Sequence, residues 1–339
     1  MLKRPFRTAL LAITVLVIAI AGYTAYWYSA AAEVRAGIAR WSDERRAAGW
    51  SVELGEPDIG GFPMRIDLRL QTPKLGGPGA HWRWALPNVR IFAAPWSPGN
   101  ISVLAPGIHV FTNRQGEYSA TFDRAEGDLA VEPGMLSKAV VRFAGIDIRQ
   151  PPGIRVRAET VTLRMQAKVL VDRDKIGAET GTGFALDARS VVLPDAWQPP
   201  LGAALARLSI DAVVTGSIEP RGNLAEILAR WRDGGGAVEV KALAVDWQML
   251  KLRADGTFAL DAALQPEGAM TAEIDGIDPT TDALIAAGAI DAKTAFAAKI
   301  ANRALSFGNR SARLPLSIQK QRLYFGPVPI LRLKPIRWE

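Results

Sequence analysis

The chain has 339 residues, of which 49% are hydrophobic and 22% are charged. These proportions are typical of a folded protein and argue against both a disordered chain and a membrane protein with many spans. Cysteine is absent and only two histidines occur, so disulfides, thiol chemistry and zinc clusters are excluded or nearly so.

The N-terminus predicts a single membrane span. Lys3, Arg4 and Arg7 give positive charge to a short segment predicted to be cytoplasmic, residues 1–8, and residues 9–28 are almost entirely apolar. About 20 helical residues, at about 1.5 Å each, cross a bilayer core of about 30 Å. Because the positive charge precedes the span, we expect a cytoplasmic N-terminus, an inner-membrane anchor and a body in the periplasm.

A cleavable signal peptide is the alternative, since small residues follow at 29–32. Aromatic residues near the end of the apolar segment favour a retained anchor, because such rings concentrate at membrane interfaces. These residues are Tyr23, Tyr26, Trp27 and Tyr28. Val34, Ile38 and Trp41 then recur at helical spacing, so residues 29–49 are predicted to form an amphipathic stalk helix.

Beyond residue 50, apolar and polar residues alternate with a period of two. Ile66, Leu68 and Leu70, for example, alternate with Asp67 and Arg69, as expected for a half-buried strand. Many similar runs, separated by glycines and prolines, predict antiparallel hairpins. We therefore expect a mainly β fold: an N-terminal transmembrane helix and stalk, followed by an elongated, curved antiparallel β-sheet body with a few short helices.

A proline-rich segment at residues 194–200 predicts a boundary between two β-rich halves, residues 50–195 and 201–339. Helices are expected in the second half, near residues 223–233 and 280–301. The first of them has Asn223 as a candidate N-cap and Glu226, three residues later, as its capping-box partner.

Three short segments are distinctive in their sequence. They read Gly-Phe-Pro-Met-Arg at residues 61–65, Pro-Trp-Ser-Pro at 95–98 and Tyr-Phe-Gly-Pro-Val-Pro-Ile at 324–330. With them, most of the chain resembles an uncharacterised bacterial family of single-span periplasmic proteins, a domain of unknown function. This resemblance implies the membrane anchor and periplasmic body, but no activity.

A second resemblance is local. Residues 231–290 contain glycine-punctuated strand units, such as those at 234–240 and 254–261. These units look like the repeated strands of the AsmA-like envelope proteins. Proteins of that group have one N-terminal inner-membrane helix and an elongated β-sheet that is thought to carry lipids, so the resemblance implies lipid handling.

The predicted helices are too few and too short to cover the apolar face of so many strands. Either the sheet closes on a dry core, or it forms a curved apolar groove for acyl chains, in which each buried methylene contributes about 0.8 kcal/mol. The first alternative predicts a non-enzymatic envelope scaffold or adaptor. The second, which we favour, predicts a lipid-binding protein of envelope lipid handling. Candidate groove residues are Leu163, Met165, Val169, Phe258, Leu260 and Ile274.

Basic residues accumulate toward the C-terminus. Six of them define a predicted basic surface: Arg310, Arg313, Lys320, Arg322, Arg332 and Lys334. In the periplasm such a surface fits anionic lipid headgroups or an acidic envelope protein, or is simply a solvated strand face. Nucleic acid is not expected as a partner, because the predicted topology places this region outside the cytoplasm.

No group of residues predicts catalysis. Ser317 and Lys320 have the spacing of a Ser-x-x-Lys acyl enzyme, but that motif requires a helix and this segment alternates like a strand. His81 and His109 lack neighbouring carboxylates that would complete a metal site. We therefore predict a non-enzymatic protein with no catalytic residue, metal or cofactor.

Overall fold

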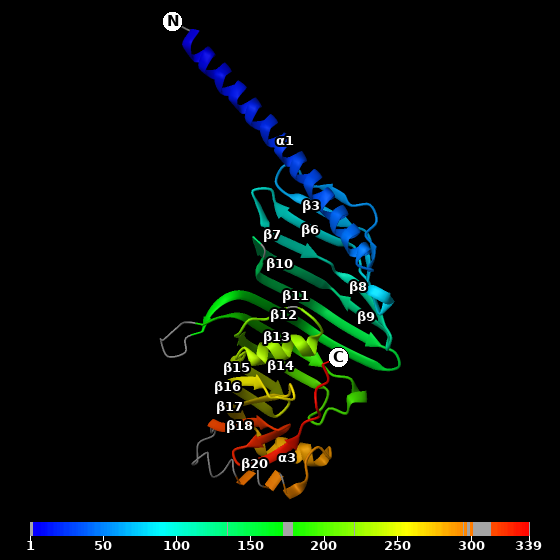
Figure 1. Cartoon of the computed structure of the whole chain (residues 1–339), viewed down its shortest axis with the longest axis vertical. Helices are drawn as coiled ribbons and strands as arrows, with labels where there is room; N and C mark the ends of the chain where they lie inside the picture. The colour runs from blue at the N-terminus through cyan, green and yellow to red at the C-terminus, as the bar shows by residue number, and fades with distance from the viewer. Residues whose placement is uncertain are drawn as a thin grey trace. The chain divides into compact units, whose positions relative to one another are not determined.

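The computed structural model describes residues 3–133, 135–171, 179–219, 221–293, 295–296, 299–300 and 313–338. The fold is mainly β, as the alternation predicts, and the paired strands are antiparallel (Figure 1). The chain divides into two compact units, residues 1–132 and 133–339. The segment at 194–200, where the sequence indicated a boundary, lies inside the second unit.

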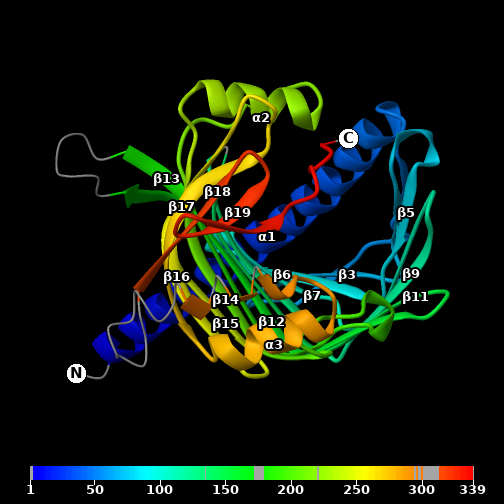
Figure 2. The same cartoon turned by 90° about the horizontal axis from the view of Figure 1, so that it is seen from below.

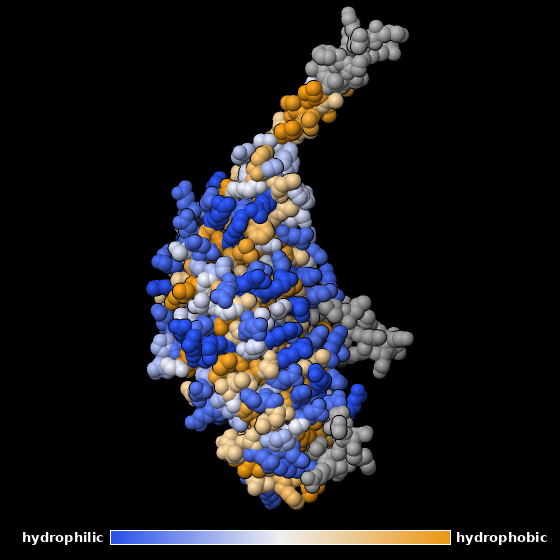
Figure 3. Space-filling view, turned by 180° about the vertical axis from the view of Figure 1, so that it is seen from behind, coloured by the Kyte–Doolittle hydropathy of each residue, from blue (hydrophilic) through white to orange (hydrophobic). Residues whose placement is uncertain are grey.

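The first unit begins with one long helix, α1 (Lys3–Ala47). From Leu11 onward this helix is long and apolar enough to cross a membrane once, and a signal sequence would have the same character. The side chains from Leu11 to Ile20 are well exposed and appear as an apolar rod in Figure 3. Exposed apolar side chains in this number need a nonaqueous environment, which a bilayer provides.

Ten strands follow α1 in the first unit. They are β1 (Ser51–Glu53), β2 (Asp58–Gly60), β3 (Ile66–Leu70), β4 (Lys74–Gly76), β5 (Trp82–Ala85), β6 (Val89–Ala94), β7 (Ser97–Leu104), β8 (Gly107–Asn113), β9 (Gly116–Phe122) and β10 (Arg124–Glu132). A short 3-10 turn, η1 (Pro78–Ala80), precedes β5. The strands pair in the orders β1-β4-β5-β8-β9 and β2-β3-β6-β7-β10. Leu68, Leu70 and Val89 form a core against which Ile38 of α1 packs.

A buried carboxylate, Asp67 of β3, also organises this unit. Its side chain is fully buried and accepts hydrogen bonds from Arg90 Nε at 2.8 and 3.0 Å. Arg65 and Arg69 lie 3.4 and 3.6 Å from the same carboxylate. The hydrogen bond from Arg90 holds the pKa of Asp67 below its usual value, although burial acts in the opposite direction.

The second unit contains the longer strands. They are β11 (Met135–Gln150), β12 (Ile154–Val171), β13 (Glu179–Val192), β14 (Ala204–Val214), β15 (Val238–Trp247), β16 (Leu250–Leu260), β17 (Pro266–Asp275), β18 (Arg313–Gln319), β19 (Arg322–Phe325) and β20 (Val328–Arg332). Each strand pairs with the next. No pairing joins β20 back to β11 among the described residues, so this sheet is open, and Figure 2 shows its curvature. The paired strands therefore do not close on themselves.

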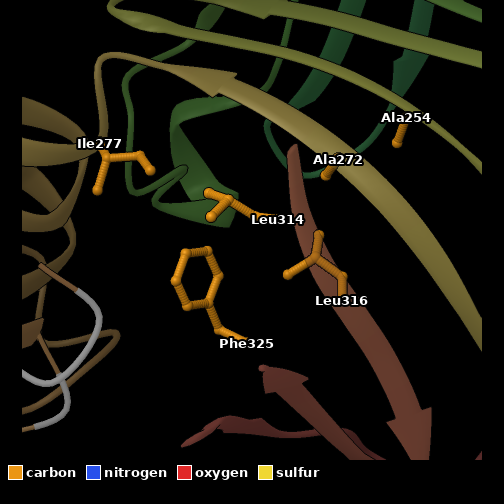
Figure 4. Packing of buried hydrophobic residues seen from close by; sticks show 6 residues of the cluster. All are labelled: Ala254, Ala272, Ile277, Leu314, Leu316 and Phe325. Carbon is orange, nitrogen blue, oxygen red and sulfur yellow. The ribbon is translucent and has the colours of Figure 1, made fainter. Parts of the chain in front are cut away.

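Short helices interrupt this sheet: α2 (Leu224–Asp233), α3 (Ile277–Ala286) and the 3-10 turn η2 (Asp195–Trp197). Figure 4 shows the core beside α3, where Ile277 faces Leu314, Leu316 and Phe325. Small residues of β16 and β17, including Ala272 with no exposed surface, complete this cluster. Part of the helical region expected at 280–301 lies outside the described residues.

Candidate functional site

The strand register of the second unit places apolar residues side by side. Directly paired residues of an antiparallel sheet point to the same face, so a row can be followed from strand to strand. One row crosses eight strands: Val141, Leu163, Leu186, Ile210, Leu243, Ala254, Ala272 and Leu314. The row beside it is Ala139, Met165, Phe184, Ala212, Val240, Gly256, Met270 and Leu316. We call the surface defined by these two rows the apolar face.

The opposite side of the same strands is polar. Its corresponding row is Arg142, Thr162, Asp187, Ser209, Ala244, Arg253, Glu273 and Arg313. Hydrophilic residues dominate the view from behind in Figure 3. The sheet is therefore amphipathic across eight strands, and only one of its two sides is suited to water.

The apolar face is covered unevenly. At β16 to β18, Ala254, Ala272 and Leu314 are buried beside α3. At β12 and β13, by contrast, Leu163 is 43% exposed and Phe184 is 44% exposed. Two large neighbouring apolar side chains at this level of exposure indicate a surface on which another apolar group can lie.

An apolar cavity of about 440 Å³ adjoins this face beneath α2. Its wall combines the sheet, the inner side of α2 and the C-terminal segment. The lining residues are Val214, Ile218, Ile227, Leu228, Trp231, Val238, Phe258, Ala259, Leu260, Pro266 and Trp338. The volume falls in the range of small-molecule sites, about 300 to 1,000 Å³, and none of the described residues that line it is charged. We call it the α2 cavity.

The roof of the cavity is held in place by specific contacts. Asn223 accepts a hydrogen bond from the Glu226 amide at 3.0 Å, which is the N-cap contact that its spacing predicts. At the other end of α2, Trp231 is buried and its Nε1 donates to the Thr215 carbonyl at 2.7 Å. Gly236 lies directly against that indole, where a Cβ atom would come within 2.3 Å of the ring. These contacts fix the inner side of α2 over the sheet.

The C-terminal segment closes one side of the cavity. Buried Gln265 donates from Nε2 to the Ile336 carbonyl at 3.1 Å and accepts from the Ile336 amide at 2.7 Å. Trp338 Nε1 donates to the Leu264 carbonyl at 2.8 Å. With its polar nitrogen satisfied in this way, the indole can present its apolar surface to the cavity.

We expect the N-cap to matter for this roof. An Asn223→Ala substitution should destabilise α2 by about 1 kcal/mol. Hydrogen exchange of the α2 amides, measured by mass spectrometry, should then be about fivefold faster. Asn223→Ser is the matched control, since serine also caps helices and should exchange almost like the native chain. Equal rates for the alanine and serine variants would contradict the proposed importance of the cap.

The structure places most predicted groove residues on one side of the sheet. Leu163 and Met165 belong to the apolar face, and Ile274 pairs with Leu252 in the next row on that side. Phe258 and Leu260 line the α2 cavity. The remaining predicted groove residue, Val169, pairs with Gly181 after an irregularity in the strand register between Gln166 and Val169. The side chain of Val169 lies outside what the structure describes.

Other predicted residues are distributed as follows. The basic residues Arg313, Lys320, Arg322, Arg332 and Lys334 are exposed, and Arg310 lies outside the described residues. Ser317 lies in β18 and Lys320 in the turn after it, so the pair has no helix to share. His109 is buried between aromatic rings and its Nε2 lies 2.8 Å from the Ala105 carbonyl oxygen.

The first unit has an apolar cavity of its own, of about 450 Å³, between α1 and its strands. Val34, Ile38 and Trp41 contribute the helical wall, and Leu68 and Val89 are among the strand residues opposite. This arrangement uses the apolar side of the predicted stalk. Both units thus combine an apolar sheet surface with an incomplete helical cover.

Two aspartates of the second unit, Asp147 and Asp187, are engaged in ion pairs with arginines. Hydrogen bonds from Arg155 and Arg149 hold the pKa of Asp147 well below its usual range. Burial is the largest single influence on the pKa of Asp187 and raises it, but the hydrogen bonds and charges of Arg189 and Arg207 together lower this pKa below its usual value. Carboxylates kept ionised in this way are poor general acids. In the described part of the chain, no three His, Asp or Glu side chains are grouped to hold a metal ion.

Comparison with known proteins gives one match. Residues 27–334 fit the model of a family described as "Uncharacterized protein conserved in bacteria (DUF2125)". The chain belongs to this family. No curated protein and no solved structure matches it, so the AsmA-like resemblance is not shown by these comparisons. The DUF2125 match covers most of both units, and within them the whole apolar face and every lining residue of the α2 cavity except Trp338.

Proposed function

We propose that this DUF2125 protein is a periplasmic protein anchored in the bacterial inner membrane, which binds the acyl chain of a membrane lipid on its apolar face and in the α2 cavity. One observation carries the proposal: two rows of apolar residues cross eight paired strands while leaving Leu163 and Phe184 exposed. Covering them with methylene groups contributes about 0.8 kcal/mol per group. In this role the protein contributes to envelope lipid handling.

The source of the ligand follows from α1. A chain whose N-terminal helix can span a bilayer is held next to a reservoir of acyl chains. Lys3, Arg4 and Arg7 before the apolar segment support a cytoplasmic N-terminus and a periplasmic body. The natural absence of cysteine makes this testable, because a single cysteine at exposed Met249 should react with a membrane-impermeant maleimide in intact spheroplasts. Protection until the cells are lysed would contradict the orientation.

We also propose that the protein is not an enzyme. Among the residues that the structure describes, no titratable side chain lines the α2 cavity, and the aspartates with lowered pKa values are engaged by arginines. Binding without chemistry requires only shape and apolar surface, which this site provides.

The basic side chains support anionic lipid headgroups as additional contacts. Arg322 and Arg332 are directly paired across β19 and β20, and both are exposed. Like charges that face each other across strands repel, so an anion between them is stabilising. An acidic envelope protein offers the same chemistry and is the partner required by the alternative function, a non-enzymatic scaffold.

A photoreactive amino acid distinguishes these functions. Placed at Met165 on the apolar face of the full chain, and activated in living cells, it should form adducts with lipids that mass spectrometry can identify. Arg164 is the matched control, because it is the adjacent residue in β12 and points to the polar side. Lipid adducts from Met165 and none from Arg164 are expected. Absence of lipid at both positions would leave the scaffold as the better explanation.

A further inference from the structure

Two loops of the first unit are attached to α1 just where its apolar segment ends. One loop, residues 61–65, joins β2 to β3, and the other is the Pro95-Trp96 turn between β6 and β7. Three side chains of α1 donate hydrogen bonds to carbonyl groups of these loops: Tyr23 Oη to Pro63, Tyr26 Oη to Pro95 at 2.8 Å and Trp27 Nε1 to Arg65 at 3.1 Å. Both loops are therefore held at the level of residues 23–27.

Aromatic packing strengthens one of these attachments. The Phe62 ring lies edge-on to Trp27, with centroids 5.5 Å apart, and stacks on Tyr28 at 6.1 Å. Trp27 itself is only 3% exposed, so it is a packing residue of this junction. The sequence predicted Trp27 as one of four interfacial aromatics, and its burial instead assigns it to holding the loop.

The tips of the two loops expose large apolar side chains. Met64 is 69% exposed, Trp96 is 65% exposed and Phe62 is 46% exposed. Loops usually present polar residues to water, so three such side chains around one helix need a nonaqueous partner. We call Phe62, Met64 and Trp96 the collar.

The position of the collar along α1 indicates that its nonaqueous partner is the membrane. The exposed apolar side chains of the helix continue to Ile20. Tyr23 and Tyr26 follow by three and six residues, which is about 4.5 and 9 Å along the helix. The headgroup region on one side of a bilayer is about 5 to 8 Å thick, and aromatic and apolar side chains are favoured at its inner boundary.

We propose that the collar inserts into the headgroup and upper acyl region of the same leaflet from which α1 emerges, so that the first unit is seated on the membrane by three segments of the chain. A helix alone permits the attached domain to tilt and rotate. Two loops that enter the interface beside it remove that freedom. This inference is independent of the lipid site of the second unit.

Single cysteines can test this insertion, because the native chain contains none. The Met64→Cys and Trp96→Cys variants of the full chain, labelled with an environment-sensitive nitrobenzoxadiazole dye, are reconstituted into vesicles of phosphatidylethanolamine and phosphatidylglycerol. We expect blue-shifted emission, strong loss of fluorescence with doxyl-labelled lipid, and protection from aqueous iodide at both positions.

Gln115→Cys is the matched control in the same unit. Gln115 lies in the exposed turn after β8, next to Arg114, which lines a cavity together with Trp50. Trp50 follows the end of α1 at Ala47, which lies 21 residues beyond Tyr26 and therefore about 32 Å farther along the helix from the span. A dye there should be quenched by iodide and not by doxyl lipid. If positions 64 and 96 behave like position 115, or if the chain does not insert into the vesicles, the proposal is wrong.

Discussion

A Phe258→Asp variant should lose bound lipid, while the sheet that contains residue 258 stays folded. Phe258 of β16 lines the α2 cavity and is paired with Val238, and the described lining includes no charged group that could compensate a carboxylate. Placing an unpaired charge in such a site costs at least about 3 kcal/mol, which lowers affinity more than about 100-fold. The measurement is the amount of lipid that copurifies with the full chain, quantified by mass spectrometry.

Thr257→Asp provides the matched control. Thr257 is the adjacent residue, is exposed, and pairs with Ala269 on the polar side of the sheet. The same charge therefore enters the same strand without entering the cavity. Lipid should be retained in this variant, and circular dichroism should show the same β content for both. Equal lipid content in the two variants would rule out the α2 cavity as the binding site.

The second large effect is expected in the first unit. Asp67→Asn should destabilise it by about 3 kcal/mol, because the substitution removes the charge of a fully buried carboxylate that accepts hydrogen bonds from Arg90, a partly exposed side chain. Urea unfolding followed by tryptophan fluorescence would measure the change. Asp58→Asn is the control: its carboxylate is exposed and lies 3.2 Å from Arg69 in the same pair of strands. Loss of such a surface pair should cost no more than about 1 kcal/mol.

The same residue predicts a dependence on pH. The pKa of Asp67 is lower in the folded chain, chiefly through the hydrogen bond from Arg90, than its unfolded value of about 3.9. The stabilisation is therefore complete above about pH 4 to 5 and is lost as pH falls through the lower, folded pKa. The unfolding free energy of the native chain should fall in this acidic range, and Asp67→Asn should reduce that dependence. An unchanged acid profile in the variant would show that other carboxylates cause it.

The sequence predicted the fold class well because the relevant signal is local. Period-two alternation, as in Leu163 and Met165, assigns a residue to one side of a strand regardless of which strand lies beside it. Glycines and prolines then indicate where strands end. The capping contact of Asn223 with Glu226 is also local, since it depends only on three residues of spacing.

The candidate site depends on contacts that are not local. Alternation cannot determine that Leu163 faces Leu186 and Val141, because register results from pairing along the whole sheet. Trp338 reaches the α2 cavity through the contacts of Gln265 with Ile336, residues that are far apart in the sequence. The boundary near residue 132 has no proline-rich linker that could have indicated it. The proline-rich segment at 194–200 did suggest a boundary, but it lies inside the second unit.

The direction of the apolar rows has a consequence for selectivity. They run across the strands, and seven spacings of about 4.8 Å give a track of about 34 Å, of which the part at β16 to β18 is buried beside α3. One leaflet of the hydrocarbon core is only about 15 Å thick, so a single fatty tail lying there would occupy less than half of the track. Contacts between methylene groups have no preferred direction, so few energy barriers would oppose movement of the fatty tail along the track. Such a surface would accept tails of many lengths, and discrimination between lipids would have to come from their polar ends.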